Sequence, residues 1–229
     1  MADFFNSSHF FFVFLTLVTY EAGFMLKEKF KFAVFNPMMI SIILSVAVIS
    51  IFKIPLSNYR KGTEFISFLL TPATVCLAIP LYEQFQKLRQ NWLAILLGII
   101  SGTITSMTLV FIFSLLFSFE KNEYIALLPK SVTTPIGMAL SKDFGGIPAI
   151  TVAVIVITGI IGAIFAPLIL KIFRITDPVA KGVAIGTSSH ALGTSKAMEM
   201  GEIEGAMSGL SVAVAGLITV ILFSFYTQV

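Results

Sequence analysis

Long apolar segments alternate with short polar ones along most of the chain. A membrane-spanning helix needs about 20 consecutive apolar residues, and about six segments approach this length, although the second is short. They cover residues 4–25, 36–52, 62–83, 91–119, 147–173 and 206–226. The pattern therefore predicts an all-α polytopic membrane protein with about six full spans.

Two further segments are too polar to face lipid. They cover residues 124–146 and 177–209, which are rich in Gly, Ser and Thr and also carry charged residues. Hydrocarbon offers polar groups no hydrogen-bond partner, so such segments must be buried in protein or line a watery cavity. We expect two broken or re-entrant polar helices, and we look for a functional site there.

Composition supports the same class of protein. The chain is 57% hydrophobic and 12% charged, whereas a soluble domain carries about 25% charged residues. The net charge of +3 is spread over short loops, which indicates membrane orientation rather than nucleic-acid binding. The single cysteine, Cys76, excludes a disulfide framework and a cysteine-based metal site. Asp3, and the lack of a small-residue cleavage pattern, predict that the first apolar segment is retained.

These features predict one transmembrane domain over residues 1–229 in the cell membrane, with several passes and no nucleic-acid partner. Similar motifs occur twice along it. Thr71-Pro72 precedes Gly98-Ile-Ile-Ser-Gly102, and Thr133-Thr134-Pro135 precedes Gly159-Ile-Ile-Gly162. Paired Pro-interrupted segments point to a transporter site, but Thr-Pro and GIIG are common in membrane helices. The motifs therefore indicate either an internal structural repeat or a coincidence.

The first polar segment contains Lys130-Ser-Val-Thr-Thr-Pro135. Proline removes a backbone donor, so the helix must open there. The hydroxyls of Ser131, Thr133 and Thr134 would then line a cavity, and Lys130 would attract an anion. The alternative is a proline kink whose hydroxyls satisfy the loosened backbone, with Lys130 extending to the membrane interface.

The second polar segment places His190 on a face of small residues. Gly186, His190, Thr194, Ala197 and Gly201 recur at helical spacing. An ionisable group at membrane depth is a functional hypothesis by default, so His190 would bind a carboxylate or carry a coupling proton. The alternative is a histidine that forms a hydrogen bond with a neighbouring helix.

Charged residues near the end of this segment have simpler explanations. Lys196 and Glu199 are three residues apart and are expected to pair on one helix face. Glu202 and Glu204 fit the first turn of the last helix, where acidic side chains complement the helix dipole. A stripe of small residues should then seat the last span against another helix; it comprises Gly201, Gly205, Gly209 and Ala213.

Enzymatic functions find little support. The chain has no HExxH motif, no GxSxG motif and no acidic pair with metal-ligand spacing. A hydrolase built on Ser189 and His190 is disfavoured, because adjacent residues point to different faces of a helix. We predict that the protein is not an enzyme and needs neither a metal nor an organic cofactor.

Four motifs together resemble the LrgB/CidB (also YohK) family. They are KSVTTPIG from Lys130, GGIPA from Gly145, GTSSHALGTSKA from Gly186 and GEIEGA from Gly201. The resemblance covers nearly the whole chain, because Asn36-Pro37 and the run after Thr71 match as well. Thr71 replaces a common glycine of the family, and Ser188-Ser189 replaces a common Ala-Ala, so small residues stand in for small ones.

The resemblance implies two functions. The family is named for holin/antiholin-like control of murein hydrolase activity and cell lysis, usually with a smaller LrgA/CidA-type membrane partner. Similar plastid proteins export glycolate and glycerate, and bacterial relatives are linked to pyruvate uptake. Two polar broken segments among apolar spans favour transport, because a pore needs amphipathic spans that assemble.

We therefore predict a secondary carrier of small monocarboxylates with a site near the middle of the membrane. The alternative is a holin/antiholin-like protein. The expected partners are the carboxylate, the lipid bilayer, an LrgA/CidA-type protein and further copies of the chain. The expected substrate-binding residues are Thr71, Pro72, Lys130, Ser131, Thr133, Thr134, Pro135, Ser188, Ser189, His190, Thr194 and Lys196.

Overall fold

A computed structural model describes residues 9–30, 35–69, 72, 75–76 and 78–228. Helices account for most of these residues, and no strand occurs among them. The chain divides into two compact units, Met1–Cys76 and Leu77–Val229, and each is described by itself. The all-α prediction is confirmed for the described part of the chain, whereas the single-domain prediction stays a prediction.

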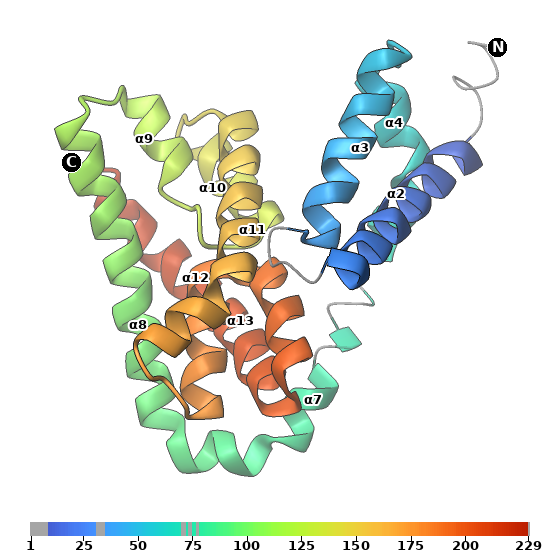
Figure 1. The fold of residues 1–229 in the computed structure, drawn as a ribbon. Helices are drawn as coiled ribbons and strands as arrows, with labels where there is room; N and C mark the ends of the chain where they lie inside the picture. The colour runs from blue at the N-terminus through green and yellow to red at the C-terminus, as the bar shows by residue number, and fades with distance from the viewer. Residues whose placement is uncertain (1–8, 31–34, 70–71, 73–74, 77, 229) are drawn as a thin grey trace. The chain divides into compact units, whose positions relative to one another are not determined.

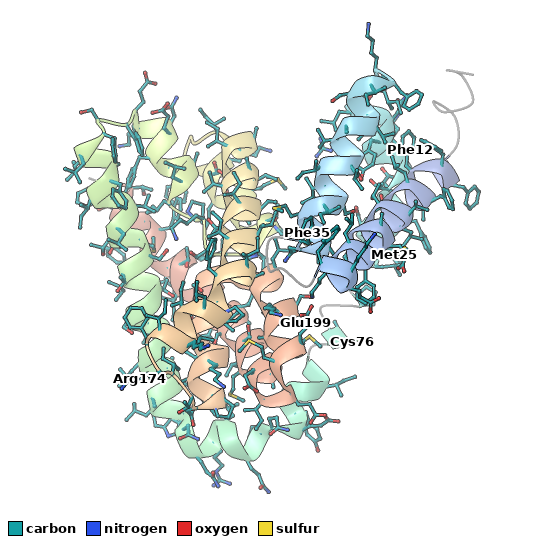
Figure 2. The ribbon with its side chains drawn as sticks, in the orientation of Figure 1. Phe12, Met25, Phe35, Cys76, Arg174 and Glu199 are labelled. Carbon is teal, nitrogen blue, oxygen red and sulfur yellow. The ribbon has the colours of Figure 1, made fainter. Side chains whose placement is uncertain are left out.

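The first unit contains four helices in its described part: α2 (His9–Phe30), α3 (Pro37–Ile51), α4 (Leu56–Gly62) and α5 (Glu64–Phe68). Helix α2 packs against α3 and α4. The buried Thr19 hydroxyl lies 3.0 Å from that of Ser41 and 3.1 Å from that of Ser45, which links α2 to α3. Phe12 of α2 is almost fully buried (Figure 2) and lies close to Gly62, where any side chain would displace it.

The second unit is organised around one central helix. Its described helices are α7 (Ala78–Glu83), α8 (Phe85–Leu116), α9 (Lys121–Leu127), α10 (Thr134–Asp143), α11 (Pro148–Ile172), α12 (Pro178–Met200) and α13 (Glu202–Tyr226) (Figure 1). Helix α12 packs against α13, α11 and α8, and α13 also contacts α8 and α7. The short helices α9 and α10 pack on α11.

Apolar residues form the contacts inside this unit and also cover its outside. Ile95 and Ile99 of α8 pack with Val183 of α12 and Met207 of α13. Side chains also project outward all along the long helices (Figure 2). Among them, Leu217 is 63% exposed. Soluble proteins rarely expose broad apolar surfaces, so these outer faces suit contact with lipid.

Four described helices are long and apolar enough to cross a membrane: Phe10–Phe30, Leu88–Leu116, Pro148–Ile172 and Glu202–Tyr226. The expected six full spans are not confirmed. Helix α3 has 15 residues, or about 22 Å at 1.5 Å per residue, which is shorter than a hydrocarbon core of about 30 Å. The expected span over residues 62–83 contains the short helices α5 and α7, with Pro72 between them.

Both polar segments are broken, as predicted. Helix α9 ends at Leu127 and α10 begins at Thr134, so the chain leaves the helical path around Lys130. Helix α12 contains one residue with non-helical angles, His190, at φ 43° and ψ −142°. No proline or glycine occupies this position. The kink therefore depends on the surroundings of His190 rather than on a helix-breaking residue.

The expected packing stripe on the last span is confirmed only in part, because Gly205 is buried against Met198 of α12 but the stripe does not continue. A Cβ at Gly209 would have no neighbour within 4 Å, and Ala213 is exposed. Instead, Gly182 and Gly186 of α12 lie directly against the backbone of Glu204 and Ser208. Glycines on α12 therefore allow the two helices to approach closely, and of these two only Gly186 was expected, on the face of His190.

The two glutamates at the start of α13 lie in its first turn, as predicted. Glu202 is exposed, but Glu204 is 8% exposed and its carboxylate lies 3.7 Å from the ammonium of Lys181 on α12. Glu204 therefore has a second role beyond complementing the helix dipole: it faces a positive charge on the neighbouring helix.

Candidate functional site

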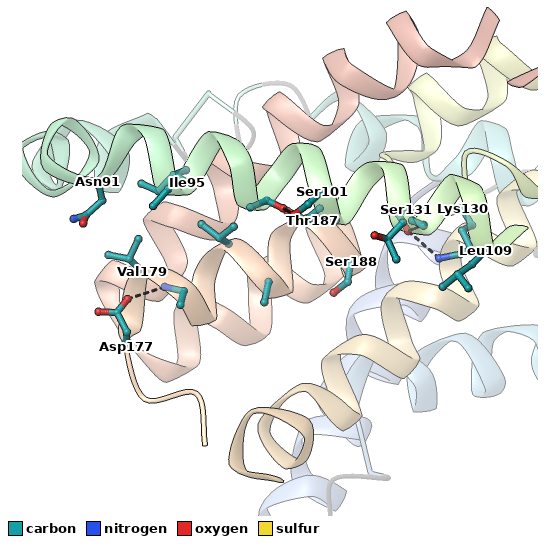
Figure 3. Close-up of a pocket in the computed structure, with 18 residues that line it drawn as sticks. Asn91, Ile95, Ser101, Leu109, Lys130, Ser131, Asp177, Val179, Thr187 and Ser188 are labelled. Carbon is teal, nitrogen blue, oxygen red and sulfur yellow. Dashed lines mark hydrogen bonds between the residues drawn. The ribbon is translucent and has the colours of Figure 1, made fainter. Parts of the chain in front are cut away.

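A groove of about 740 Å³ lies in the second unit (Figure 3). Helix α8 forms one wall, the first half of α12 forms the other, and the turn at Lys130 and Ser131 closes one end. All of these elements belong to the same unit. The groove is therefore defined independently of where the first unit lies.

Small residues bring the two walls together. A Cβ at Gly98 would lie 3.3 Å from Val183, and a Cβ at Gly102 would lie 2.8 Å from Thr187. Without side chains at these two positions, α8 approaches α12 closely, as small residues allow in membrane helices. Ser101 and Thr105 line the groove on the same helix.

The groove is long and has a different charge at each end. Asn91 and Leu109, which both line it, are eighteen residues apart on α8, or about 27 Å along a helix. Asn91 and Asp177 lie towards one end, and Lys130 lies at the other (Figure 3). The length is close to the thickness of a hydrocarbon core, about 30 Å.

The negative end has a structural explanation. Asp177 is the N-cap of α12, and its carboxylate accepts a hydrogen bond of 2.8 Å from the backbone N–H of Ala180 (Figure 3). An acidic N-cap satisfies a free backbone donor and complements the helix dipole. Pro178 follows at the first helical position, where it loses no hydrogen bond.

The positive end has no such partner. Lys130 is partly buried, and its ammonium donates a hydrogen bond of 3.1 Å to the Ser131 hydroxyl. The Ser131 hydroxyl lies 3.1 Å from that of Ser106 on α8. Within the described part of the chain, Lys130 forms no salt bridge. The groove thus ends at a cation that an anion could approach from the groove.

Lys130, Ser131 and Ser188 are the expected site residues that line this groove. Three other expected residues begin α10 instead: Thr133 is its N-cap, and Thr134 and Pro135 form its first turn. They follow Lys130 in sequence, but α10 continues against α11.

His190 lies in a packed interface rather than in the groove. Its Nε2 atom lies 2.8 Å from the backbone carbonyl of Ile155 on α11, and the residue is 3% exposed. A Cβ at Gly159 would lie 2.7 Å from the His190 ring, so this glycine makes room for the imidazole. The alternative expectation, a hydrogen bond to a neighbouring helix, is therefore confirmed.

The remaining expected residues of α12 lie beside His190 or at the far end of the helix. Ser189 packs against Gly162 of α11. The Thr194 hydroxyl donates to the His190 carbonyl and lies 2.9 Å from the Ser208 hydroxyl of α13. Lys196 forms a salt bridge of 2.8 Å with Glu199, as predicted.

The expected contribution of Thr71 and Pro72 to the site stays a prediction. Thr71 lies outside the described residues, and Pro72 is exposed and belongs to the first unit. The two glycine motifs do share one neighbour. The pair at 98 and 102 packs on α12 before the kink, and the pair at 159 and 162 packs on α12 at the kink.

Sequence reasoning missed the wall formed by α8. Ala94, Gly98, Ser101 and Thr105 line the groove at helical spacing, and Thr187 joins them from α12. The signal was present, because small and polar residues recur every three or four positions within an apolar span. It was interpreted only as part of a repeat.

The groove combines apolar walls, several hydroxyls and the ammonium of Lys130, which forms no salt bridge with the described residues, and this suits a small anion with an apolar part. No cluster of three or more His, Cys, Asp or Glu side chains suited to a metal occurs among the described residues. The long apolar helices together with this polar groove define a helical membrane protein.

Comparison with known proteins identifies the family. The model of the LrgB-like family matches residues 16–229, and the chain belongs to this family. The antiholin-like protein LrgB of Bacillus subtilis (strain 168) is 36% identical over 222 residues, which cover 96% of each chain. The protein of the same name from Bacillus cereus (strain B4264) is 37% identical over 213 residues, 93% of each chain. No solved structure matches the chain significantly.

Proposed function

We propose that this chain is an antiholin-like protein that crosses the cell membrane several times. The observation that carries the proposal is the similarity to curated relatives of that name along 93–96% of both chains. In this role the protein would restrain murein hydrolase activity and cell lysis. It would act with an LrgA/CidA-type membrane protein and as a homo-oligomer, and it would not be an enzyme.

The test is controlled expression and deletion in a bacterium that carries the gene. Deletion should raise extracellular murein hydrolase activity and the rate of lysis, and re-expression should restore both. The protein must be detected in the membrane fraction of the restored strain. Unchanged hydrolase activity and lysis after deletion would contradict the antiholin-like role.

A second candidate is a carrier of small monocarboxylates, and the groove specifically favours it. The groove ends at Lys130, whose ammonium is not paired with a carboxylate in the described part of the chain. It is bordered by the turn between the short helices α9 and α10, at Lys130 and Ser131, and by the part of α12 that precedes the kink at His190. Discontinuous helices of this kind form the substrate sites of many secondary transporters. The carboxylate would bind at Lys130, and no metal or organic cofactor would be needed.

Reconstitution in liposomes separates the two candidates. A carrier should take up labelled glycolate, glycerate, lactate or pyruvate with saturation under a pH gradient, in the presence of the LrgA/CidA-type partner. An antiholin-like protein that carries no solute should show no saturable uptake, and a holin-like pore should release a trapped dye without a gradient or solute. Absence of uptake for all four solutes with the partner present would exclude the carrier.

A further inference from the structure

A second, much smaller cavity lies beside the groove, with a volume of about 10 Å³. It is enclosed by α8, the turn before α10, α12 and α13. Five of its lining residues carry hydroxyl groups: Thr103, Ser106, Ser131, Thr187 and Thr219. Three of these, Ser106, Ser131 and Thr187, also line the groove, so the two cavities adjoin.

Two of the hydroxyls have no partner within the described chain. Thr103 is 4% exposed and Thr187 is 5% exposed, and the Oγ1 atom of each is buried without a hydrogen bond. A threonine in a helix commonly donates to the carbonyl four residues earlier, as Thr19 and Thr194 do here. Thr103 and Thr187 forgo this bond, although buried hydroxyls are rarely left unsatisfied. Both line the small cavity, which points to a ligand there.

A chain of hydrogen-bonding groups reaches the same cavity from its other side. Lys130 donates to Ser131, and the Ser131 and Ser106 hydroxyls lie 3.1 Å apart. An ammonium group can only donate, so the Ser131 oxygen accepts from Lys130. The Ser131 hydroxyl can then donate its hydrogen to the Ser106 oxygen. Ser106 then has a hydrogen left to donate to an acceptor in the cavity.

Size and charge restrict the ligand. A volume of about 10 Å³ is at the lower limit, roughly 10–15 Å³, for a cavity that holds one water molecule, so nothing larger than a single small group fits. A cation is disfavoured for two reasons. The positive ammonium of Lys130 is hydrogen-bonded to Ser131, which lines the cavity. No carboxylate is among the cavity's described lining residues. An apolar group would leave the hydroxyls of Thr103 and Thr187 unsatisfied.

We propose that the small cavity is a binding site for a single oxygen atom that bridges Thr103 and Thr187 and accepts from the chain that starts at Lys130. The oxygen belongs to a water molecule or to a solute that lies in the groove. The site is independent of the proposed function in the first case. In the second case it rests on the carrier function and forms the end of its substrate site.

Thr103→Val and Thr187→Val test the site, because each replaces only a hydroxyl by a methyl group. Thr158→Val is the matched control, since Thr158 lies on α11 and lines neither cavity. Thermal unfolding in detergent without solute tests for water. A bound water predicts that each variant unfolds at a lower temperature than the control variant. The fall in unfolding temperature of the double variant should be smaller than the sum of the two single falls, because both hydroxyls bind the same molecule.

Unfolding with added glycolate, glycerate, lactate or pyruvate tests for a solute oxygen. If the oxygen belongs to a solute, both variants should unfold at the same temperature as the control variant when no solute is present. When solute is added, they should lack the rise in unfolding temperature that it gives the parent chain. If both variants match or exceed the control without solute and keep the full rise with it, the oxygen site is excluded. A high-resolution map with no density between the two hydroxyls, with and without solute, would exclude it independently.

Discussion

Lys130 and His190 both occupy polar segments between apolar helices, but the two segments use their polar groups differently. Lys130 lies where two short helices meet, and its ammonium borders the groove with one serine as its hydrogen-bond partner. His190 lies inside a helix that continues after the kink, and its ring is enclosed by α11. The first segment leaves a charge accessible from a cavity, whereas the second uses a polar side chain to fix a backbone position.

Neighbouring glycines account for the difference at His190. Gly159 leaves space for the imidazole, and Gly162 leaves space for Ser189. The Ile155 carbonyl then provides a partner for the ring. Together they hold His190 at a positive φ, which costs about 1–3 kcal/mol for a residue other than glycine. The polar groups of this segment therefore have structural roles, and an exposed binding site is more strongly indicated at Lys130.

The largest effect on stability is expected at the glycines that hold α12 in place. A Cβ at Gly186 would lie 2.8 Å from the Ser208 Cα, which is backbone and cannot rotate away. Gly186→Ala should therefore destabilise the protein by about 3 kcal/mol, the upper end of the usual cost of overpacking. Gly209→Ala is the control, because nothing lies near its Cβ position. It should be neutral or stabilising by up to about 1 kcal/mol. Thermal unfolding in detergent that shifts in the same direction for both variants would contradict this account.

The next largest effect is expected on solute binding at Lys130. Lys130→Met removes the charge but keeps most of the side chain's length. Loss of a hydrogen bond to a charged group costs about 1.5–3 kcal/mol, so carboxylate affinity should fall roughly 10- to 100-fold. Thermal stability should fall little, because the variant breaks only the hydrogen bond to Ser131 and no ion pair among the described residues.

Lys142→Met is the matched control for that variant, since Lys142 is exposed at the end of α10 and does not line the groove. Carboxylate uptake into liposomes that contain the partner measures the effect. Equal uptake by Lys130→Met and Lys142→Met would place the anion elsewhere.

Local sequence patterns were sufficient to predict several of the helices and the break around Lys130. Apolar runs of the right length predict α8, α11 and α13, because each is long and apolar enough to cross a membrane. Pro129 and Pro135 predict the break around Lys130, because each lacks a backbone donor and disfavours a helical turn before it, although a single proline such as Pro167 is accommodated within α11. The apolar segment over residues 36–52 forms a helix of only 15 residues, and the full span expected over residues 62–83 stays a prediction.

The groove and the kink could not be predicted in the same way, because both depend on which helices become neighbours. Ser101 and Thr105 form a wall only because α8 packs against the first half of α12. His190 adopts its unusual angles only because α11 presents glycines to it. Nothing in the residues around His190 indicates a positive φ at that position.

A pair of variants at His190 tests whether α12 is kinked at this residue. Both His190→Gly and His190→Ala lose the hydrogen bond to Ile155, so both should unfold at a lower temperature. Glycine adopts a positive φ without strain, so the glycine variant should be more stable than the alanine variant by about 1 kcal/mol or more. In a continuous helix the order would be reversed by about 1 kcal/mol. Thermal unfolding of the two purified variants therefore decides between a kinked and a continuous α12.

The smallest effect on stability is expected at Lys196. It is the only lysine besides Lys130 among the expected site residues, so it can be compared with Lys130 directly. Its ammonium lies 2.8 Å from the Glu199 carboxylate, three residues further along the helix, and the Glu199 side chain is 48% exposed. Exposed pairs at this spacing contribute about 0.2–0.5 kcal/mol. A double-mutant cycle of Lys196→Ala and Glu199→Ala should give a coupling of that size, which weakens at high salt. Because Lys196 does not line the groove, Lys196→Ala should keep the carboxylate uptake that Lys130→Met loses. Loss of uptake in both variants would mean that the carboxylate binds at both lysines rather than at Lys130 alone.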